Sequence, residues 1–100
     1  MTYTSGIWLV RDGHEADFVA AWSDFAQWIA GWPGAQELRL VRDLDQPHRF
    51  LSFAPWDSFD EQRAWKESPE FRERIGRVRK HVEDFTPSTY ELVLTVRPGP

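Results

Sequence analysis

Apolar residues recur along this chain at two different spacings, and the order of these spacings limits the possible folds more than any other feature. In two segments the apolar residues lie three or four positions apart, which is typical of one face of a helix. They are Phe18, Trp22, Phe25 and Ile29 in the first segment, and Phe71, Ile75, Val78, Val82 and Phe85 in the second. Strand-like patterns, alternating or continuously apolar, occupy residues 6–11, 35–44, 48–54 and 90–97.

Turn and capping residues mark where these segments begin and end. The Asp and Glu at the two ends of residues 12–15 have the spacing of a capping box and predict the start of the first helix. The Gly-Trp-Pro-Gly sequence at 31–34 ends that helix. A second capping box at 58–61 predicts a short helix through Trp65, and Ser-Pro-Glu at 68–70 predicts the start of the last helix, with the serine as its N-cap.

The element order is therefore β-α-β-β-α-β, which predicts an α+β fold of the ferredoxin-like type in a single domain of residues 1–100. In this fold the helices cover one face of a four-stranded antiparallel sheet, so the strands should be polar on the other face. Apolar side chains such as Ile7, Leu51, Phe53 and Val93 instead populate both faces. Because soluble monomers rarely expose so large an apolar patch, we expect a homodimer whose two sheets pack face to face.

The charge and composition of the chain exclude several classes of protein. Sixteen acidic and twelve basic residues give a net charge of −4, which argues against a nucleic-acid partner. The chain has no cysteine, so thiolate catalysis, zinc fingers and cysteine-bound iron–sulfur clusters are excluded. No apolar run reaches the ~20 residues of a membrane span, and the first residues lack the pattern of a signal peptide. We therefore expect a cytoplasmic protein that does not associate with membranes.

Residues 53–71, with the sequence Phe-Ala-Pro-Trp-Asp-Ser-Phe-Asp-Glu-Gln-Arg-Ala-Trp-Lys-Glu-Ser-Pro-Glu-Phe, resemble the antibiotic biosynthesis monooxygenase family of dimeric α/β barrels. That family has a strand ending in Trp and a capped short helix, followed by Trp, Ser and Phe at the spacing of Trp65, Ser68 and Phe71. The resemblance implies a homodimer with a pocket in each subunit, between helices and sheet, for a small planar aromatic molecule. In some members O₂ oxidises this molecule without metal or flavin.

What the resemblance implies about the site can be placed on residues of this sequence. The expected pocket walls, for which ordinary core packing is the alternative role, are Trp22, Trp28, Phe53, Trp65 and Phe71. We expect Ser52 or Tyr90 to donate a hydrogen bond to a substrate oxygen. We expect His48 or His81 to accept a proton, because imidazole titrates nearest neutrality. No histidines or carboxylates have metal-ligand spacing, so we expect no metal, and the resemblance implies no other cofactor.

The leading interpretation is a cofactor-independent monooxygenase that oxidises a small phenol, hydroquinone or anthrone, and two other functions fit the same fold. A branch of the superfamily degrades haem, with an Asn on the first strand and a His ligand ten residues after the Trp of the short helix. Gly6 and Ile75 occupy these places here, so we do not expect haem degradation. The other alternative is a non-catalytic binding or stress-response protein, which the absence of Asp, Glu and His within the apolar strands favours.

Overall fold

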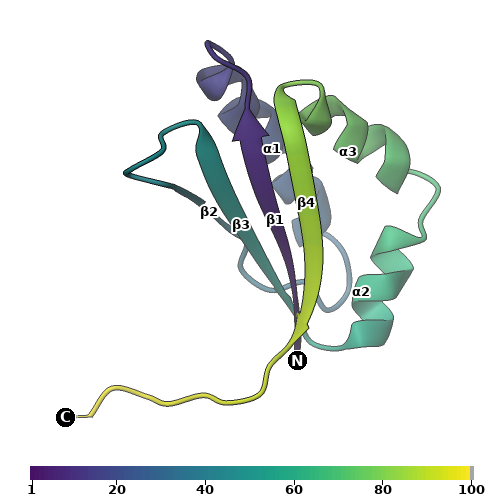
Figure 1. Cartoon of the computed structure of the whole chain (residues 1–100). Coiled ribbons are helices and arrows are strands. Elements are labelled where there is room, and N and C mark those ends of the chain that lie inside the picture. The colour runs from purple at the N-terminus through teal and green to yellow at the C-terminus, as the bar shows by residue number, and fades with distance from the viewer. Residues whose placement is uncertain (100) are drawn as a thin grey trace.

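The computed structural model describes residues 1–99, which form one four-stranded sheet and three helices (Figure 1). The elements are β1 (Thr2–Val10), α1 (Glu15–Ala30), β2 (Arg39–Arg42), β3 (Arg49–Trp56), α2 (Phe59–Lys66), α3 (Phe71–Arg79) and β4 (Val82–Glu91). Neighbouring strands are antiparallel, and their order across the sheet is β2-β3-β1-β4. The predicted ferredoxin-like fold is confirmed, with the second helical region divided into two helices. Within residues 1–99, no helix is long and apolar enough to cross a membrane.

The register of the strands decides which side chains face the helices. Residues directly opposite each other in antiparallel strands share a face of the sheet. Trp8 lies opposite Phe50 on β3 and Phe85 on β4, and Gly6 lies opposite Ser52. The core that these side chains form with the helices contains Trp8, Val10, Phe18, Phe25, Ile29, Phe50, Trp56, Trp65, Val78 and Val82. A row of aromatic rings therefore crosses the middle of the sheet on its helix-covered face.

Helix α1 has the predicted apolar stripe but begins differently. Its buried residues are Phe18, Phe25 and Ile29. The residue before the helix is His14, and no side chain caps its first turn, so the capping box predicted between Asp12 and Glu15 is wrong. Asp12 instead lies in a turn with Gly13, whose φ of 82° is in the left-handed region. This turn places Asp12 two residues before the N-cap position.

The two short helices begin in different ways. Ser58 caps α2 as predicted, because the Glu61 amide donates to Ser58 Oγ at 3.2 Å and the Ser58 hydroxyl donates to the Glu61 carboxylate at 3.0 Å. The cap predicted at Ser68 is wrong, since α3 begins only at Phe71 and has no side-chain cap. The Ser68 carbonyl instead accepts the Phe71 amide at 3.2 Å, which closes the turn between the two helices.

The last helix and the last strand differ most from the prediction. Helix α3 ends at Arg79, and β4 starts at Val82 instead of at Tyr90, so the strand predicted at 90–97 is wrong for most of its length. Pro87 lies within β4 and does not end an element. Because β4 is an edge strand, a proline there costs the sheet little.

A β-bulge explains why the start of β4 has helical spacing in the sequence. The register with β1 shifts between Leu9 and Val10, so that Val82 lies opposite Val10 and Phe85 lies opposite Trp8. The bulge puts one extra residue into β4, and side chains three positions apart then share a face. Val82 and Phe85 therefore continue the three-and-four spacing of α3 although they belong to a strand.

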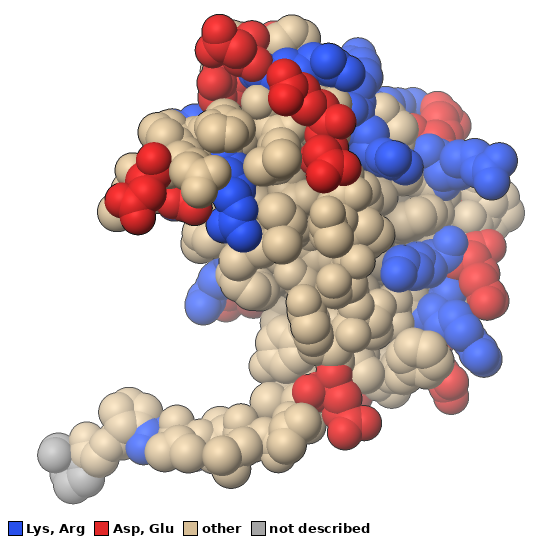
Figure 2. Space-filling view, viewed as in Figure 1, with Lys and Arg blue, Asp and Glu red and all other residues tan. Residues whose placement is uncertain are grey.

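The face of the sheet that points away from the helices is apolar at its centre. Its apolar side chains are Tyr3, Ile7, Leu9, Val41, Leu51, Phe53 and Tyr90. Figure 2 views the molecule from this side and shows an uncharged centre with the acidic and basic side chains around it. Beyond β4, residues 92–99 extend away from the body of the protein (Figure 1), with Val93, Leu94 and Val96 exposed.

Candidate functional site

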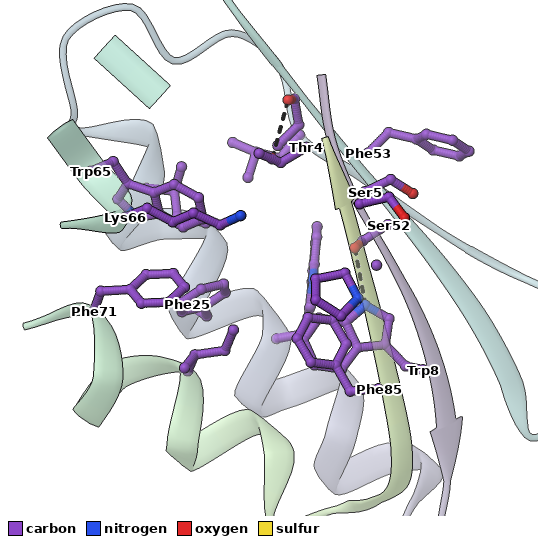
Figure 3. Close-up of a pocket in the computed structure, with 18 of the residues that line it drawn as sticks. Thr4, Ser5, Trp8, Phe25, Ser52, Phe53, Trp65, Lys66, Phe71 and Phe85 are labelled. Atoms are coloured by element: carbon purple, nitrogen blue, oxygen red, sulfur yellow. Dashed lines mark hydrogen bonds between the residues drawn. The ribbon is translucent and has the colours of Figure 1, made fainter. Parts of the chain in front are cut away.

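A cavity of about 210 Å³ lies between the sheet and the helices (Figure 3). Its lining includes residues of β1, β3 and β4 and of all three helices. Most of these side chains are apolar, and two are ionisable: Lys66 and Arg79. The cavity is therefore an apolar space with positive charge and no acidic group in its lining.

Aromatic rings from all three helices form the helix side of the cavity. Trp65 on α2 meets Phe71 on α3 edge to face, with ring centroids 4.9 Å apart and an interplanar angle of 87°. Phe25 on α1 lies 6.0 Å from Trp65 and 6.3 Å from Phe71. The apolar stripe of α1, the end of α2 and the start of α3 thus converge on one aromatic cluster.

The sheet side of the cavity is formed by the stacked rings of Trp8 and Phe85, whose centroids are 3.9 Å apart. Gly6 lies next to them, and a Cβ at this position would be 2.7 Å from Phe85 Cε1 and 2.8 Å from Trp8 Nε1. Contacts this short do not occur without a shift of the neighbouring rings. The absence of a side chain at Gly6 therefore makes room for the two rings.

The polar groups of the lining include the Ser52 hydroxyl and the Trp65 indole N–H. Trp8 Nε1 donates to Ser52 Oγ at 3.0 Å, which leaves the proton of the Ser52 hydroxyl free to be donated elsewhere. Trp65 Nε1 has no acceptor within residues 1–99, although Trp65 is only 4% exposed. A buried donor without a partner is costly, so an oxygen atom of a bound molecule would be a favourable acceptor.

The structure places the expected wall residues in three different positions. Trp22, Trp65 and Phe71 line the cavity, as does Ser52, one of the two expected donors. Phe53 is also part of the lining, but Figure 3 shows its ring on the outer side of the sheet. Two expected residues, Trp28 and Tyr90, do not line it. Trp28 lies behind Trp65 with a centroid distance of 6.4 Å, and Tyr90 is exposed on the outer face of the sheet.

The two histidines expected to accept a proton lie outside the cavity. His48 is exposed in the turn before β3, where its carbonyl accepts the Val10 amide at 2.8 Å. His81 follows α3 and is half-buried, with its Nδ1 3.3 Å from Nδ1 of His14. Within residues 1–99 there is also no group of three His, Cys, Asp or Glu residues that could hold a metal ion.

The lining residues that were not singled out in the sequence as parts of the site include Gly6, Trp8, Lys66 and Arg79. For Arg79 a signal does exist, because it follows Ile75 by four positions and therefore lies on the same side of α3. Gly6 and Trp8 could not be found in this way, since their position depends on pairing with β3 and β4.

Comparison with known sequences identifies a family. A sequence model of the family described as antibiotic biosynthesis monooxygenase matches residues 7–76. The chain is 26% identical over 84 residues to Protein SchA of Streptomyces halstedii. That match covers 84% of this chain but 22% of SchA, so the chain spans less than a quarter of the length of this relative.

Solved structures share the fold. SnoaB of Streptomyces nogalater, described as a cofactor-independent oxygenase, is similar with a TM-score of 0.89 and 20% identity in the structure of a single-substitution variant, over 97% of both chains. A protein of Deinococcus radiodurans, described as a candidate antibiotic biosynthesis monooxygenase, has a TM-score of 0.86 and 21% identity over 100% of both chains. The region matched by the family model includes Trp22, Ser52, Trp65 and Phe71 of the cavity lining. The chain therefore belongs to the antibiotic biosynthesis monooxygenase family.

Proposed function

We propose that this protein is a cofactor-independent monooxygenase that oxidises a planar phenol, hydroquinone or anthrone with O₂. The cavity carries this proposal, because its walls are aromatic and Ser52 and Trp65 offer hydrogen-bond donors within it. Membership of the family supports a monooxygenase-like role. The description of the similar SnoaB as a cofactor-independent oxygenase supports the absence of a cofactor.

A substrate of this kind can itself reduce dioxygen once it has lost a proton. The enolate of an anthrone transfers one electron to O₂, and the superoxide then joins the ring carbon to form a peroxide. Loss of the remaining proton on that carbon breaks the O–O bond and releases water. One oxygen atom ends in the new carbonyl and the other in water, so O₂ accepts the four electrons that the substrate loses. The protein has to bind, desolvate and orient the substrate.

The lining residues suggest how this protein assists the reaction. The Ser52 hydroxyl and the Trp65 indole N–H donate to the substrate oxygen that becomes negative when the enolate forms, which lowers the cost of ionisation. Phe25 and Phe71 hold the planar rings. Because His48 and His81 lie outside the cavity, we assign the released proton to solvent at the exposed rim of the cavity.

Oxygen uptake with a panel of anthrones and hydroquinones tests this proposal. Trp65→Phe and Ser52→Ala each remove one donor, and we expect each to lower kcat about tenfold or more. Trp32→Phe is the matched control, because Trp32 does not line the cavity, and it should leave the rate unchanged. Uptake by Trp65→Phe and Ser52→Ala at the wild-type rate, with circular dichroism confirming their fold, contradicts the proposed roles.

A non-catalytic binding protein is the second candidate. The lining of the cavity has no carboxylate or imidazole to act as a general base, and this observation favours binding without reaction. In that case the same aromatic compounds bind, and O₂ is consumed no faster than in the absence of protein. Titration of the intrinsic tryptophan fluorescence, combined with the uptake assay, separates the two functions.

We also propose that two copies of the chain associate through the uncovered face of the sheet. The uncharged centre of this face and the partly exposed Val41, Phe53 and Tyr90 support an apolar interface (Figure 2). The exposed apolar residues of the segment 92–99 give a second reason for a partner, because this segment makes little contact with its own chain (Figure 1). We propose that the same partner, a second copy of the chain, covers both the sheet face and this segment.

A further inference from the structure

Two histidines that are 67 positions apart in the sequence, His14 and His81, bring their ring nitrogens together. Nδ1 of His14 lies 3.3 Å from Nδ1 of His81, and the ring centroids are 5.5 Å apart with an interplanar angle of 54°. Both rings are half-buried, and neither lines the cavity between the sheet and the helices. The pair is therefore a cluster of potential ligand atoms separate from the candidate site.

The backbone holds both histidines in place through one residue, Arg11. The Arg11 amide donates to the His81 carbonyl at 3.0 Å, and the Arg11 carbonyl accepts the His14 amide at 2.9 Å. His14 directly precedes α1, and His81 lies between α3 and β4. The turn after β1 and the turn before β4 lie at the same end of the sheet (Figure 1). The imidazoles are thus positioned by hydrogen bonds that do not involve the rings.

The distance between the two nitrogens is that of two ligands of one metal ion. Hydrogen bonds from N–H groups to oxygen in proteins span about 2.7–3.2 Å, so 3.3 Å is long by this measure. Two imidazole nitrogens bound at about 2.0–2.1 Å to a tetrahedral ion lie about 3.3–3.4 Å apart. A metal ion could therefore bind both Nδ1 atoms without a change in their separation.

There is space beside His81 for further ligands of such an ion. A groove of about 210 Å³ has His81 in its lining, with residues of α1 and α3 and one carboxylate, that of Asp24. In the described part of the chain, no group of three His, Cys, Asp or Glu residues could hold a metal ion. Water would therefore complete the coordination, as it does at metal sites that keep an open position.

The charges near the pair have both signs. Glu15 and Asp17 are in the first turn of α1. Three basic residues line the groove, and two of them, Arg74 and Arg77, pair with a glutamate one turn earlier, at 3.9 and 2.6 Å. The third, Lys80, forms no ion pair within residues 1–99. The local charge is thus mixed and does not by itself repel a cation.

We propose that His14 and His81 bind one divalent transition-metal ion, such as Zn²⁺, through their Nδ1 atoms. Imidazole nitrogen suits Zn²⁺, whereas Mg²⁺ and Ca²⁺ take oxygen ligands. The ion joins the start of α1 to the residue before β4 and stabilises the folded chain, because the unfolded chain does not hold the two rings together. The inference does not depend on the proposed function, since neither histidine lines the cavity. The expectation of no metal rested on spacing along the sequence, which does not register this pair.

Thermal denaturation of the untagged protein with Zn²⁺ alone tests the inference. We expect Zn²⁺ at ten times its Kd to raise the Tm by about 5 °C or more, because a ligand that binds the folded state stabilises it by mass action. Mg²⁺ at the same concentration should leave the Tm unchanged. Isothermal titration calorimetry should give one Zn²⁺ per chain, with an affinity that falls about tenfold or more in His14→Gln and in His81→Gln.

Co²⁺ reports the geometry of the site. Tetrahedral Co²⁺ absorbs visible light strongly and octahedral Co²⁺ absorbs it weakly. We expect the strong absorption with the wild-type protein and its loss in both single variants. This spectrum and the Zn²⁺ titration of the wild type need no substitution, so they still decide the question if a variant does not fold.

His48→Gln is the matched control, because it removes the third imidazole of the chain from the exposed turn before β3. It should bind Zn²⁺ as the wild type does. Four outcomes overturn the inference: no effect of Zn²⁺ on the wild-type Tm, weak octahedral absorption with Co²⁺, an equal loss of affinity in His48→Gln, and unchanged affinity in His14→Gln and His81→Gln. The last would indicate an adventitious ion only. None of these outcomes bears on the proposed oxidation in the cavity.

Discussion

Trp8 donates its indole N–H to the hydroxyl oxygen of Ser52 at 3.0 Å, and this bond joins β1 to β3 on the sheet side of the cavity. Gly6 lies directly opposite Ser52, and a Cβ at Gly6 would be 3.0 Å from Ser52 Oγ. The tryptophan, the serine and the glycine therefore depend on one another. All three residues line the cavity.

We expect Gly6→Ala to destabilise the protein and to weaken binding of an aromatic ligand. The new methyl group would meet Phe85 Cε1 at 2.7 Å and Trp8 Nε1 at 2.8 Å, so the stacked rings must shift. Overpacking of this kind costs about 1–3 kcal/mol of unfolding free energy. Urea denaturation measures the loss, and quenching of tryptophan fluorescence by anthracene-2-methanol measures the binding.

Gly76→Ala is the control for that substitution. Gly76 lies within α3, and a Cβ there would meet nothing within 4 Å. Because alanine favours a helix interior over glycine by up to about 1 kcal/mol, we expect this variant to be as stable as the wild type or more stable. An equal loss of stability in Gly6→Ala and Gly76→Ala would contradict the prediction that the short contacts at Gly6 cause the destabilisation.

We expect Ser52→Ala to lower stability as well as activity. The substitution removes the acceptor of the buried Trp8 indole N–H, and a buried donor without a partner costs about 1–3 kcal/mol. Thermal denaturation followed by circular dichroism checks this. Ser23→Ala, which removes an exposed hydroxyl that accepts from Gln27, should change stability by less than about 0.5 kcal/mol.

The proposed interface predicts that Ile7→Lys dissociates the homodimer. Ile7 lies opposite Leu51 and Thr86, near the centre of the uncovered face, so the lysine is solvated in a monomer and buried in a dimer. Sedimentation velocity at micromolar concentration should show a dimer for the wild type and a monomer for the variant. Val19→Lys adds the same charge at an exposed position of α1 and should remain dimeric. A monomeric wild type rules out the interface.

The turn between β2 and β3 should make a pH-dependent contribution to stability. The pKa of Asp43 lies below its ordinary value of 3.8, mainly because the amides of Gln46 and Asp45 donate to its carboxylate, at 3.0 and 2.8 Å. A carboxyl group whose pKa is lowered by folding stabilises the folded state above its unfolded pKa. This contribution is lost as the pH falls through the lowered pKa.

Asp43→Asn therefore should lower the melting temperature at pH 7, and the difference from the wild type should be smaller near pH 2, because the contribution is lost as the pH falls through the lowered pKa. Differential scanning calorimetry at the two pH values measures the two differences. The matched variant Asp45→Asn removes an exposed charge from the same turn and should show no such pH dependence. A difference for Asp43→Asn that is equal at both pH values would contradict the assignment.

Much of the architecture could be predicted from local patterns. The stripe of Phe18, Phe25 and Ile29 and the cap at Ser58 were readable because helix period and capping depend on residues within a few positions of one another. The start of α1 could not be predicted from such local patterns. Gly13, with a φ of 82°, belongs to a turn that moves Asp12 away from the N-cap position. Local spacing alone does not distinguish a capping box from such a turn.

The site was harder to predict than the fold. Trp22, Ser52, Trp65 and Phe71 were expected in the pocket and line the cavity, but His48 and His81, expected as proton acceptors, do not. Chemical type selected the histidines, whereas their position is set by the turn before β3 and by the end of α3. Arg79 was interpreted as part of the solvated face of the last helix, because basic residues on an amphipathic helix are usually solvated, and an arginine that reaches inward was only the alternative. In the structure Arg79 lines the cavity.

The sequence by itself determined the order of the elements, the apolar face of α1 and the aromatic content of the core. The tertiary structure alone decided that Val82 and Phe85 belong to a strand, because a bulge against β1 gives them helical spacing. It also decided which side chains meet across the cavity. Periodicity reports which residues share a face, but contact between two faces depends on pairings such as that of Trp8 with Ser52, 44 positions apart, and no local pattern records those.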